Sequence, residues 1–555
     1  MPLFIIFYAI YLICFGMLGI FRYHVAILDV VEESGTELQS DLNNKHRNNK
    51  VKFYKCDITN DDQLFGVFKD VTDEHGYIDV VINNAGIMND SLEMYKKEID
   101  VNLVIFFSYT FFQTSLVTCT LKALELMRKD EGGKGGTVIN ISSIAGLMQT
   151  SVMPIYLATK AAVIQFSNCI GIEDYYSLTG MRVLTICFGA TETPLIAAEN
   201  LGSYDKNIAE VLYEKLRVDC PVQSKEMAAK GLIKAYKQGE TSSTWLIECD
   251  KPARDITHAV KAAYGIMWEC VSKINIKRYK CVIMSFGFEN KVFIVTGGAA
   301  GVGAGIVRQL LSEDARHVAF LDVAEREGAT LEAELSNKFG ALRAKFIKCD
   351  ISDDTELAAA YNQVFDKYRR LDVVINNAGV LITDETLYKK LIDINFTATV
   401  SSTYRALNIM GVDKGGSGGT IINLSSLLAL QHKSHFPLYA ATKTAVLQFS
   451  NSMGENYAKS KVRVVTVCLG PTDTAILHRH NLEKFDKDCS QCLTSRTPER
   501  QRVASAVTGI IEVMNRGKSG STWIIADNKP PVDITNNIQQ GFQHMTRGVN
   551  EAHLL

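Results

Sequence analysis

The sequence predicts an α/β protein built from two tandem doubly wound parallel-sheet (Rossmann) domains. Three observations predict this fold class. The chain repeats itself, each copy alternates short β-branched runs with helical segments of about 10 to 20 residues, and one copy has a glycine-rich turn between a strand and a helix. A length of 555 residues exceeds one ordinary core and suits two domains.

The internal repeat shows in motifs at constant spacing. HVAILDV (24–30) recurs as HVAFLDV (317–323), a displacement of 293 residues, and DVVINNAG recurs with the same displacement. Further along, GGTVINISS and YLATK recur as GGTIINLSS and YAATK with a displacement of 283 residues. Ten extra residues therefore lie in the first copy between Asn102 and Gly135, and we expect them in the apolar stretch at 105–117.

The expected strands of the second copy are, in order, VFIVTG, HVAFLDV, LDVVINNAG, GTIINLSS and RVVTVCLG. Each is apolar at successive positions, so it offers an apolar side chain to both faces of the sheet. Strands of this kind are typical of parallel sheets that helices cover on both sides.

Composition excludes some classes of function. Hydrophobic residues make up 47% of the chain and charged residues 22%, and the net charge is -2. Without an excess of basic residues we expect no nucleic-acid partner. Cys56 recurs as Cys349 and Cys187 as Cys468, in apolar runs that predict reduced core thiols.

A lone CxxC is formed by Cys489 and Cys492. A structural zinc site needs four ligands, and no second pair completes one. A chance loop spacing is favoured over a metal site, and we assign no metal.

The glycine-rich turn belongs to the second copy. In VFIVTGGAAGVGAG the glycines Gly297, Gly301 and Gly303 stand between a strand and a helix. Glycine allows a tight turn and a close approach of the backbone to a pyrophosphate, which the helix N-terminus then binds. Asp322 ends the next strand, where a carboxylate accepts hydrogen bonds from ribose hydroxyls and repels a 2′-phosphate. This arrangement predicts NAD rather than NADP.

The first copy has no such turn in its sequence. The displacement of 293 places the three glycine positions at Phe4, Tyr8 and Ile10. We therefore expect the first domain to lack its normal first strand and glycine loop, unless LFIIFY (3–8) substitutes as the strand.

The apolar segment at residues 1–21 has three interpretations. It is about long enough for a membrane anchor. As a signal peptide it lacks a basic n-region and an evident cleavage site. The third interpretation is a buried or aberrant segment in place of the true N-terminal sequence.

A candidate catalytic group follows in the second copy. Ser426 ends an apolar strand, and Tyr439 and Lys443 are four residues apart on a predicted helix, which places them on one face. A neighbouring ammonium stabilises a phenolate and lowers the pKa of the phenol, so the tyrosine can exchange a proton with an alcohol.

Over about 265 residues the second copy resembles the short-chain dehydrogenase/reductase family, through TGGAAGVG, Asp322, CDI, NNAG, LSS, YAATK and LGPTDT in the family's order. The resemblance implies a catalytic triad of Ser426, Tyr439 and Lys443, with Asn395 completing a tetrad through a water. The cofactor-binding residues that it implies are Gly297, Gly301, Val302, Gly303, Asp322, Asp350, Ile351, Asn377, Tyr439, Lys443, Thr472 and Thr474.

Within the family, the run from LSS to DTAIL is most similar to the branch of 15-hydroxyprostaglandin dehydrogenase and the insect-type alcohol dehydrogenases. Two positions depart from the family pattern. Leu469, and Phe188 in the first copy, replace a proline, and Phe436 replaces a substrate-binding glutamine of the prostaglandin enzyme. Prostaglandin is therefore not favoured, and we expect an apolar pocket for a secondary alcohol or ketone.

The first copy (22–268) keeps Asp29 and the tetrad positions Asn102, Ser143, Tyr156 and Lys160. These are either inherited scaffold residues or the remains of a domain whose true N-terminus is missing. A linker at 269–288 precedes the second copy (289–555), and Met284 reads as a usable start, so the chain joins two paralogues, either as a real fusion or through gene prediction.

The sequence thus predicts an NAD-dependent oxidoreductase in the second copy that acts on a small apolar alcohol or ketone. The alternative is a non-catalytic binding or storage protein with the same fold. The resemblance implies a homodimer or an intrachain pseudo-dimer. Asn-x-Ser/Thr sequons fall at Asn89, Asn140, Asn395 and Asn423, and three of them lie in elements expected to be buried or catalytic, which favours the cytoplasm.

Overall fold

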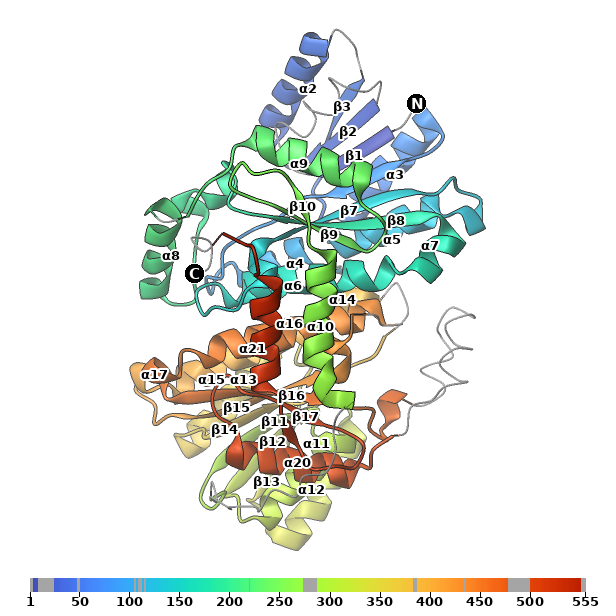
Figure 1. Ribbon diagram of the computed structural model, residues 1–555. Helices are drawn as coiled ribbons and strands as arrows, with labels where there is room; N and C mark the ends of the chain where they lie inside the picture. The colour runs from blue at the N-terminus through green and yellow to red at the C-terminus, as the bar shows by residue number, and fades with distance from the viewer. Residues whose placement is uncertain are drawn as a thin grey trace. The chain divides into compact units, whose positions relative to one another are not determined.

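A computed structural model describes residues 3–7, 24–46, 50–103, 106–107, 112–113, 116–218, 220–272, 287–382, 387–432, 436–477 and 500–550. Its chain divides into two compact units, with most of the first copy in one and most of the second copy in the other. Each copy forms an eight-stranded sheet (Figure 1).

The sheet of the first copy has the strand order β10-β9-β8-β7-β4-β1-β2-β3. All neighbours pair in parallel except β10, which is antiparallel to β9. The strands are β1 (Leu3–Phe7), β2 (His24–Asp29), β3 (Val51–Lys55), β4 (Val80–Asn83), β7 (Gly136–Ser143), β8 (Met181–Phe188), β9 (Ser243–Ile247) and β10 (Arg254–Asp255).

The sheet of the second copy has the equivalent order β13-β12-β11-β14-β15-β16-β17-β18, again parallel up to its last, antiparallel strand. Its strands are β11 (Val292–Thr296), β12 (His317–Asp322), β13 (Ala344–Lys348), β14 (Val373–Asn376), β15 (Gly419–Ser426), β16 (Val462–Leu469), β17 (Thr522–Ile525) and β18 (Val532–Asp533). The predicted doubly wound parallel sheet is thereby confirmed in both copies.

Helices connect the strands in both copies (Figure 1). In the first copy they are α2 (Glu32–His46), α3 (Asp61–His75), α4 (Tyr95–Asn102), α5 (Leu116–Met127), α6 (Pro154–Ile170), α7 (Glu173–Thr179), α8 (Lys206–Val218), α9 (Lys225–Gln238) and α10 (Thr257–Ser272). In the second they are α11 (Gly301–Ser312), α12 (Glu325–Phe339), α13 (Asp354–Tyr368), α14 (Tyr388–Ile392), α15 (Ala398–Met410), α16 (Pro437–Gly454), α17 (Tyr457–Ser460), α20 (Val503–Arg516) and α21 (Thr535–Met545).

Strand β1 decides one question that the sequence left open. It pairs in parallel with β2 on one side and with β4 on the other, the position that β11 takes between β12 and β14. LFIIF (3–7) therefore supplies the first strand of the first copy. The pairing also corrects the expected equivalence of Phe4 with Gly297. Leu3 pairs with His24 as Val292 pairs with His317, so Phe4 matches Phe293 inside the strand. The positions equivalent to the glycine turn fall in residues 8–23, which lie outside the described residues.

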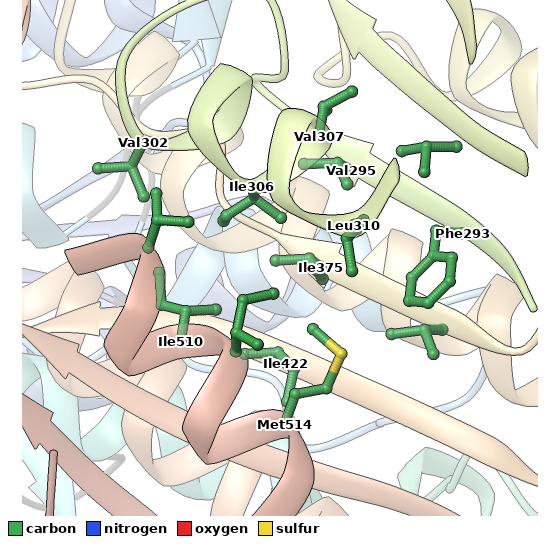
Figure 2. Close-up of a cluster of buried hydrophobic side chains, with 14 of the residues drawn as sticks. Phe293, Val295, Val302, Ile306, Val307, Leu310, Ile375, Ile422, Ile510 and Met514 are labelled. Atoms are coloured by element: carbon green, nitrogen blue, oxygen red, sulfur yellow. The ribbon is translucent and has the colours of Figure 1, made fainter. Parts of the chain in front are cut away.

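One face of the second sheet packs against α11 and α20 (Figure 2). Phe293 and Val295 of β11 meet Ile306 of α11 and Ile510 of α20 in a buried apolar cluster. Burying apolar area of this kind is the main stabilising contribution to folding, at about 25 cal/mol per Å² removed from water. The cluster holds the strand and the helix that flank the glycine turn.

The opposite face of the central strands carries a buried polar network. Ile422 and Leu424 point into the apolar cluster, so Asn423 between them points the other way. There Asn376 Nδ2 donates to Asn423 Oδ1 at 2.7 Å, and Asn423 Nδ2 donates to Ser450 Oγ at 2.9 Å. The first copy repeats this network with Asn83, Asn140 and Ser167.

This network bears on the sequons. Asn140, Asn395 and Asn423 are each 0% exposed, which confirms that three of the four sequons lie in buried elements. An attached glycan has no room at these positions in the folded chain.

The ten extra residues of the first copy interrupt a helix. Helix α4 ends at Asn102 and α5 starts at Leu116, with the short antiparallel pair β5 (Phe106–Phe107) and β6 (Phe112–Gln113) between them. In the second copy α14, a π-helical turn η6 (Asp393–Thr397) and α15 follow one another without a gap. The predicted place of the insertion is therefore confirmed.

Several sequence predictions concern cysteines and the chain ends. Cys56, Cys187, Cys349 and Cys468 are free and buried, as predicted, and burial raises the pKa of each thiol to about 12. Cys489, Cys492 and Met284 lie outside the described residues, and residues 269–272 of the predicted linker belong to α10.

The described residues contain neither a cluster of metal-ligating side chains nor a single membrane-spanning helix. There, no group of three or more His, Cys, Asp or Glu side chains is placed to hold a metal ion. In the same part of the chain no single helix has the length and hydrophobicity to cross a membrane, although the bent pair α6 and α7 together meets that test.

Candidate active site

The glycine turn after β11 has a backbone that only glycine adopts easily. Gly297 and Gly301 have φ values of 64° and 53°, in the left-handed region. A Cβ on Gly303 would lie 2.8 Å from Asn377 Nδ2 and closer still to the carbonyl oxygen of Gly297. The turn therefore packs tightly against the start of α11 and leaves backbone N–H groups at the helix N-terminus, where an anion can bind.

Asp322 at the end of β12 is tied to this turn. One carboxylate oxygen accepts a hydrogen bond from Ala299 N and the other from Ala324 N, both at 3.0 Å. A negative charge thus lies at the edge of the glycine turn. In the first copy the equivalent Asp29 ends β2 and accepts from Val31 N at 2.8 Å.

Two further segments reach the turn. Asn377 Nδ2 donates to the carbonyl oxygens of Thr296 and Gly297 at 2.9 and 3.0 Å. A Cβ on Gly301 would lie 3.2 Å from Thr474 Cγ2, so the loop after β16 meets the turn from the other side. The structure therefore brings these predicted cofactor residues together.

The remaining predicted cofactor residues have other partners. Thr472 Oγ1 donates to Gly470 O at 2.9 Å, and Asp350 accepts from the hydroxyl of Ser352 at 2.6 Å. Ile351, next to Asp350, is half-buried. The side chain of Val302 belongs to the apolar cluster, so only its backbone N–H is available to a cofactor.

Helix α16 carries Tyr439 and Lys443 on one face. Lys443 Nζ donates to Leu424 O at 3.1 Å, two residues before Ser426 on β15. Ser426 is 8% exposed, and its hydroxyl accepts from Leu428 N at 3.2 Å. Strand β15 and α16 thus bring Ser426 and Lys443 of the predicted triad to the carboxyl edge of the sheet.

Burial governs the charge of the lysine. Lys443 is only 4% exposed, and desolvation lowers its pKa from 10.5 to about 8. The amine therefore changes protonation close to physiological pH, which suits a group that exchanges protons with a neighbouring phenol.

Asn395 meets Lys443 at Gly379. A Cβ on Gly379 would lie 3.3 Å from both Asn395 Oδ1 and Lys443 Nζ. The amide of Asn395 also clamps the backbone of Val380, accepting from its N–H at 2.8 Å and donating to its carbonyl at 2.9 Å. The side chain of Asn395 is thus fixed by the backbone of Val380 beside the lysine.

The first copy reproduces this geometry. Lys160 Nζ donates to Ile141 O at 3.3 Å, and burial lowers the pKa of Lys160 to about 8. Asn102 and Lys160 again flank a glycine. A Cβ on Gly86 would lie 3.3 Å from both Asn102 Oδ1 and Lys160 Nζ. Burial raises the pKa of Tyr156 well above its usual value, against a smaller opposing effect of its hydrogen bond with Ser143.

A buried acid pair in the first copy was not predicted from the sequence. Asp90 and Glu98 are both 0% exposed, and burial together with their mutual repulsion raises the pKa of Glu98 well above its ordinary value. The second copy has Thr383 and Leu391 at these positions. At the position of Glu98 the second copy has a leucine, although the surrounding helix sequences match closely. This difference between the copies was the signal that could have identified the pair.

We expect Lys443→Met to remove a pH dependence of stability. The pKa of Lys443 is about 8 in the folded chain and 10.5 as its ordinary value. Between these two pH values the lysine is protonated in the unfolded chain and neutral in the folded one, so the free energy of unfolding rises with pH. Below about pH 8 the lysine is protonated in both the folded and the unfolded chain, so the folded chain bears the full free-energy cost of burying its charge. Urea midpoints without nucleotide should therefore rise less with pH in Lys443→Met than in the wild type.

Lys160→Met makes the same substitution in the first copy, where burial also lowers the pKa of the lysine to about 8. It should reduce the rise of the urea midpoint with pH by a similar amount. An unchanged pH dependence in Lys443→Met would contradict this assignment.

The chain is similar to known dehydrogenases. The family model described as short chain dehydrogenase matches residues 21–202 and 291–484. The 15-hydroxyprostaglandin dehydrogenase [NAD(+)] of Macaca fascicularis is 38% identical over 189 residues, which are 34% of this chain and 70% of that protein. Alcohol dehydrogenase 2 of Ceratitis cosyra is 38% identical over 169 residues, 29% of this chain and 60% of that protein.

Among solved structures, the NADPH-dependent 3-quinuclidinone reductase from Rhodotorula rubra has a TM-score of 0.39 and 22% identity, and the match covers 46% of this chain and 97% of the reductase. The two curated relatives are of the kinds that the motifs from LSS to DTAIL predicted.

Proposed function

Because the chain belongs to the short-chain dehydrogenase family, we propose that its second copy is an NAD-dependent oxidoreductase that interconverts a secondary alcohol and a ketone on a small apolar molecule. The observation that supports this most is that one copy carries both the glycine turn after β11 and Ser426 at the end of β15, at the carboxyl edge of one sheet. Open α/β sheets bind their ligands at this edge.

The residues around the glycine turn fit a dinucleotide. The N-terminus of α11 would bind the pyrophosphate, and Asp322 would accept hydrogen bonds from the ribose hydroxyls. The carboxylate of Asp322 disfavours a 2′-phosphate, which supports NAD over NADP. The relative from Macaca fascicularis is named as an NAD(+) enzyme.

In the proposed mechanism the protein's part is proton transfer and orientation. The nicotinamide, when bound, accepts the hydride. Ser426 holds the substrate oxygen, and Tyr439 takes the hydroxyl proton as the alcohol is oxidised. Lys443 stabilises the phenolate and returns the proton toward solvent, with Asn395 beside it.

The proposed substrate class rests on Phe436, the residue before α16. Phe436 stands three residues before Tyr439, where the resemblance places a substrate-binding glutamine in the prostaglandin enzyme. A phenyl ring offers no hydrogen bond to a polar substrate group, so an apolar alcohol or ketone is preferred.

Calorimetric titration of the full chain with NADH should give one site per chain. Only the second copy has the glycine turn in its sequence, and NADPH should bind at least tenfold more weakly because Asp322 repels the extra phosphate, by an estimated 1.4 kcal/mol or more. Two NADH sites per chain would show that the first copy binds nucleotide as well. NADPH binding as tight as NADH would refute the role of Asp322.

A further inference from the structure

The first copy holds two acidic side chains in its interior that the proposed function does not use. Asp90 lies in the loop after β4 and Glu98 lies on α4, and both are 0% exposed. Helix α4 lies beside α6, whose first turn Asp90 contacts (Figure 1). The second copy has Thr383 and Leu391 at these positions, so the acid pair is particular to the first copy.

Asp90 caps α6 from outside the helix. The side chain of the N-cap residue Met153 makes no capping bond, and the first N–H groups of a helix have no acceptor within it. Asp90 supplies the acceptors, since its Oδ2 accepts from Ile155 N at 2.6 Å and its Oδ1 from Tyr156 N at 3.1 Å. These two donors and the positive end of the helix dipole favour the charged form of Asp90 over that of Glu98.

Glu98 lies against this carboxylate. Neither of its buried oxygens accepts a hydrogen bond of ordinary geometry from a described donor, and the nearby N–H of Asn89 favours its charge only weakly. Lys160 of α6 also favours the charge, but burial and the charge of Asp90 prevail and raise the pKa of Glu98 well above 4.5. A proton on Glu98 removes one of two neighbouring buried charges and donates a hydrogen bond to Asp90.

The loop that carries Asp90 also reaches a third element. Asp90 N donates to Gly202 O at 3.1 Å, and Asn89 Nδ2 donates to Asn200 O at 3.2 Å. The segment 200–203 brings no titratable side chain to the pair, whereas α6 brings Tyr156 and Lys160. A cavity of about 510 Å³ in the first copy has residues of this loop and of this segment among its lining. A movement of the loop therefore moves part of the cavity wall.

We propose that Asp90 and Glu98 form a pH-sensitive latch, which holds the loop after β4 on the first turn of α6 while the pair shares one proton and releases it when Glu98 ionises. Ionisation places two negative charges side by side in the interior. The loop is the element that can carry Asp90 outward, because its next residues Leu92 and Glu93 are exposed. The N–H groups of Ile155 and Tyr156 then lose their acceptor.

The latch makes the first copy less stable as the pH rises. Between the ordinary pKa of 4.5 and the higher folded value, Glu98 is protonated in the folded chain and charged in the unfolded chain, so the free energy of unfolding falls with rising pH. Asp90, whose pKa burial raises to about 7, acts in the same direction up to that pH. Lys160 and Lys443 act in the opposite direction above about pH 8, so only a substitution of Glu98 isolates its share.

The test is hydrogen exchange of the peptide with Ile155 and Tyr156 in the full chain, relative to the intrinsic rate at each pH. In the wild type this relative rate should rise about tenfold or more between about pH 7 and about pH 10. The infrared band of a protonated carboxyl group, in the difference spectrum against Glu98→Gln, should disappear over the same range. Glu98→Gln places an uncharged donor against Asp90 and should keep both amides protected. Glu125→Gln, at an exposed glutamate of α5, is the matched control and should behave as the wild type does.

A second variant, Glu98→Leu, introduces the residue of the second copy and should also abolish the rise. Circular dichroism checks that each variant folds, and the wild-type measurement needs no variant. The proposal is overturned if the carboxyl band is absent at about pH 7, if it persists at about pH 10, if exchange in the wild type does not change with pH, or if the rise survives in Glu98→Gln or Glu98→Leu. These measurements need no turnover, so their failure is distinct from failure of the dehydrogenase proposal.

Discussion

Replacing Tyr439 with phenylalanine should lower the kcat of NAD-dependent alcohol oxidation by about 10²- to 10⁴-fold, the usual contribution of a positioned general acid or base. The variant keeps the ring on α16 and removes only the hydroxyl that we assign to proton transfer. Steady-state formation of NADH from a secondary alcohol measures the effect.

Tyr457→Phe is a matched control, because this tyrosine of the second copy is 41% exposed, and its loss of a hydroxyl should leave turnover unchanged. Undiminished turnover in Tyr439→Phe would refute the mechanism. Loss of turnover in Tyr156→Phe, with turnover retained in Tyr439→Phe, would assign the catalytic site to the first copy.

A methyl group at Gly303 should weaken NADH binding by about 10²-fold. Alanine would place its Cβ 2.8 Å from Asn377 Nδ2 and against the carbonyl of Gly297, so the turn must shift by about 1 Å, and displacements of this size at a site commonly have such an effect. Titration of Gly303→Ala with NADH, compared with the wild type, measures the change in Kd.

The control makes the same substitution where there is room. Gly66 lies in α3, and a Cβ there would meet no atom within 4 Å. Gly66→Ala should leave NADH affinity unchanged and stabilise the helix by about 0.5–1 kcal/mol. Wild-type affinity for NADH in Gly303→Ala would exclude the glycine turn as the cofactor site.

The sequence predicted the parallel sheets because each strand is short, β-branched and apolar on both faces, and because the repeat showed every motif twice. It also predicted the insertion after Asn102, since a change of displacement from 293 to 283 has a definite position along the chain. Strand β1 was harder, because LFIIFY reads equally well as a strand and as part of a longer apolar segment.

Other features depend on distances that spacing does not encode. Asp90 and Glu98 are charged residues, which usually face solvent, and only the fold brings them together in the interior. The cavity of the first copy requires the 3-10 turn at Pro194–Ile196 and α8 to meet α6, and these segments are distant in sequence. The clamp of Asn395 on Val380 likewise joins residues that the motifs do not connect.

That π-turn, Asp393–Thr397, means that the run from α14 to α15 contains one residue more than a regular α-helix would need. Deleting a single residue there would restore the α-helical hydrogen-bond pattern. It would also rotate α14, which precedes the turn, by about 100° about the helix axis. The helix would gain regular hydrogen bonds, while the amide of Asn395 would turn away from Val380. The site thus depends on the length of the chain here as well as on the identity of its side chains, and a one-residue deletion could inactivate it without replacing any catalytic residue.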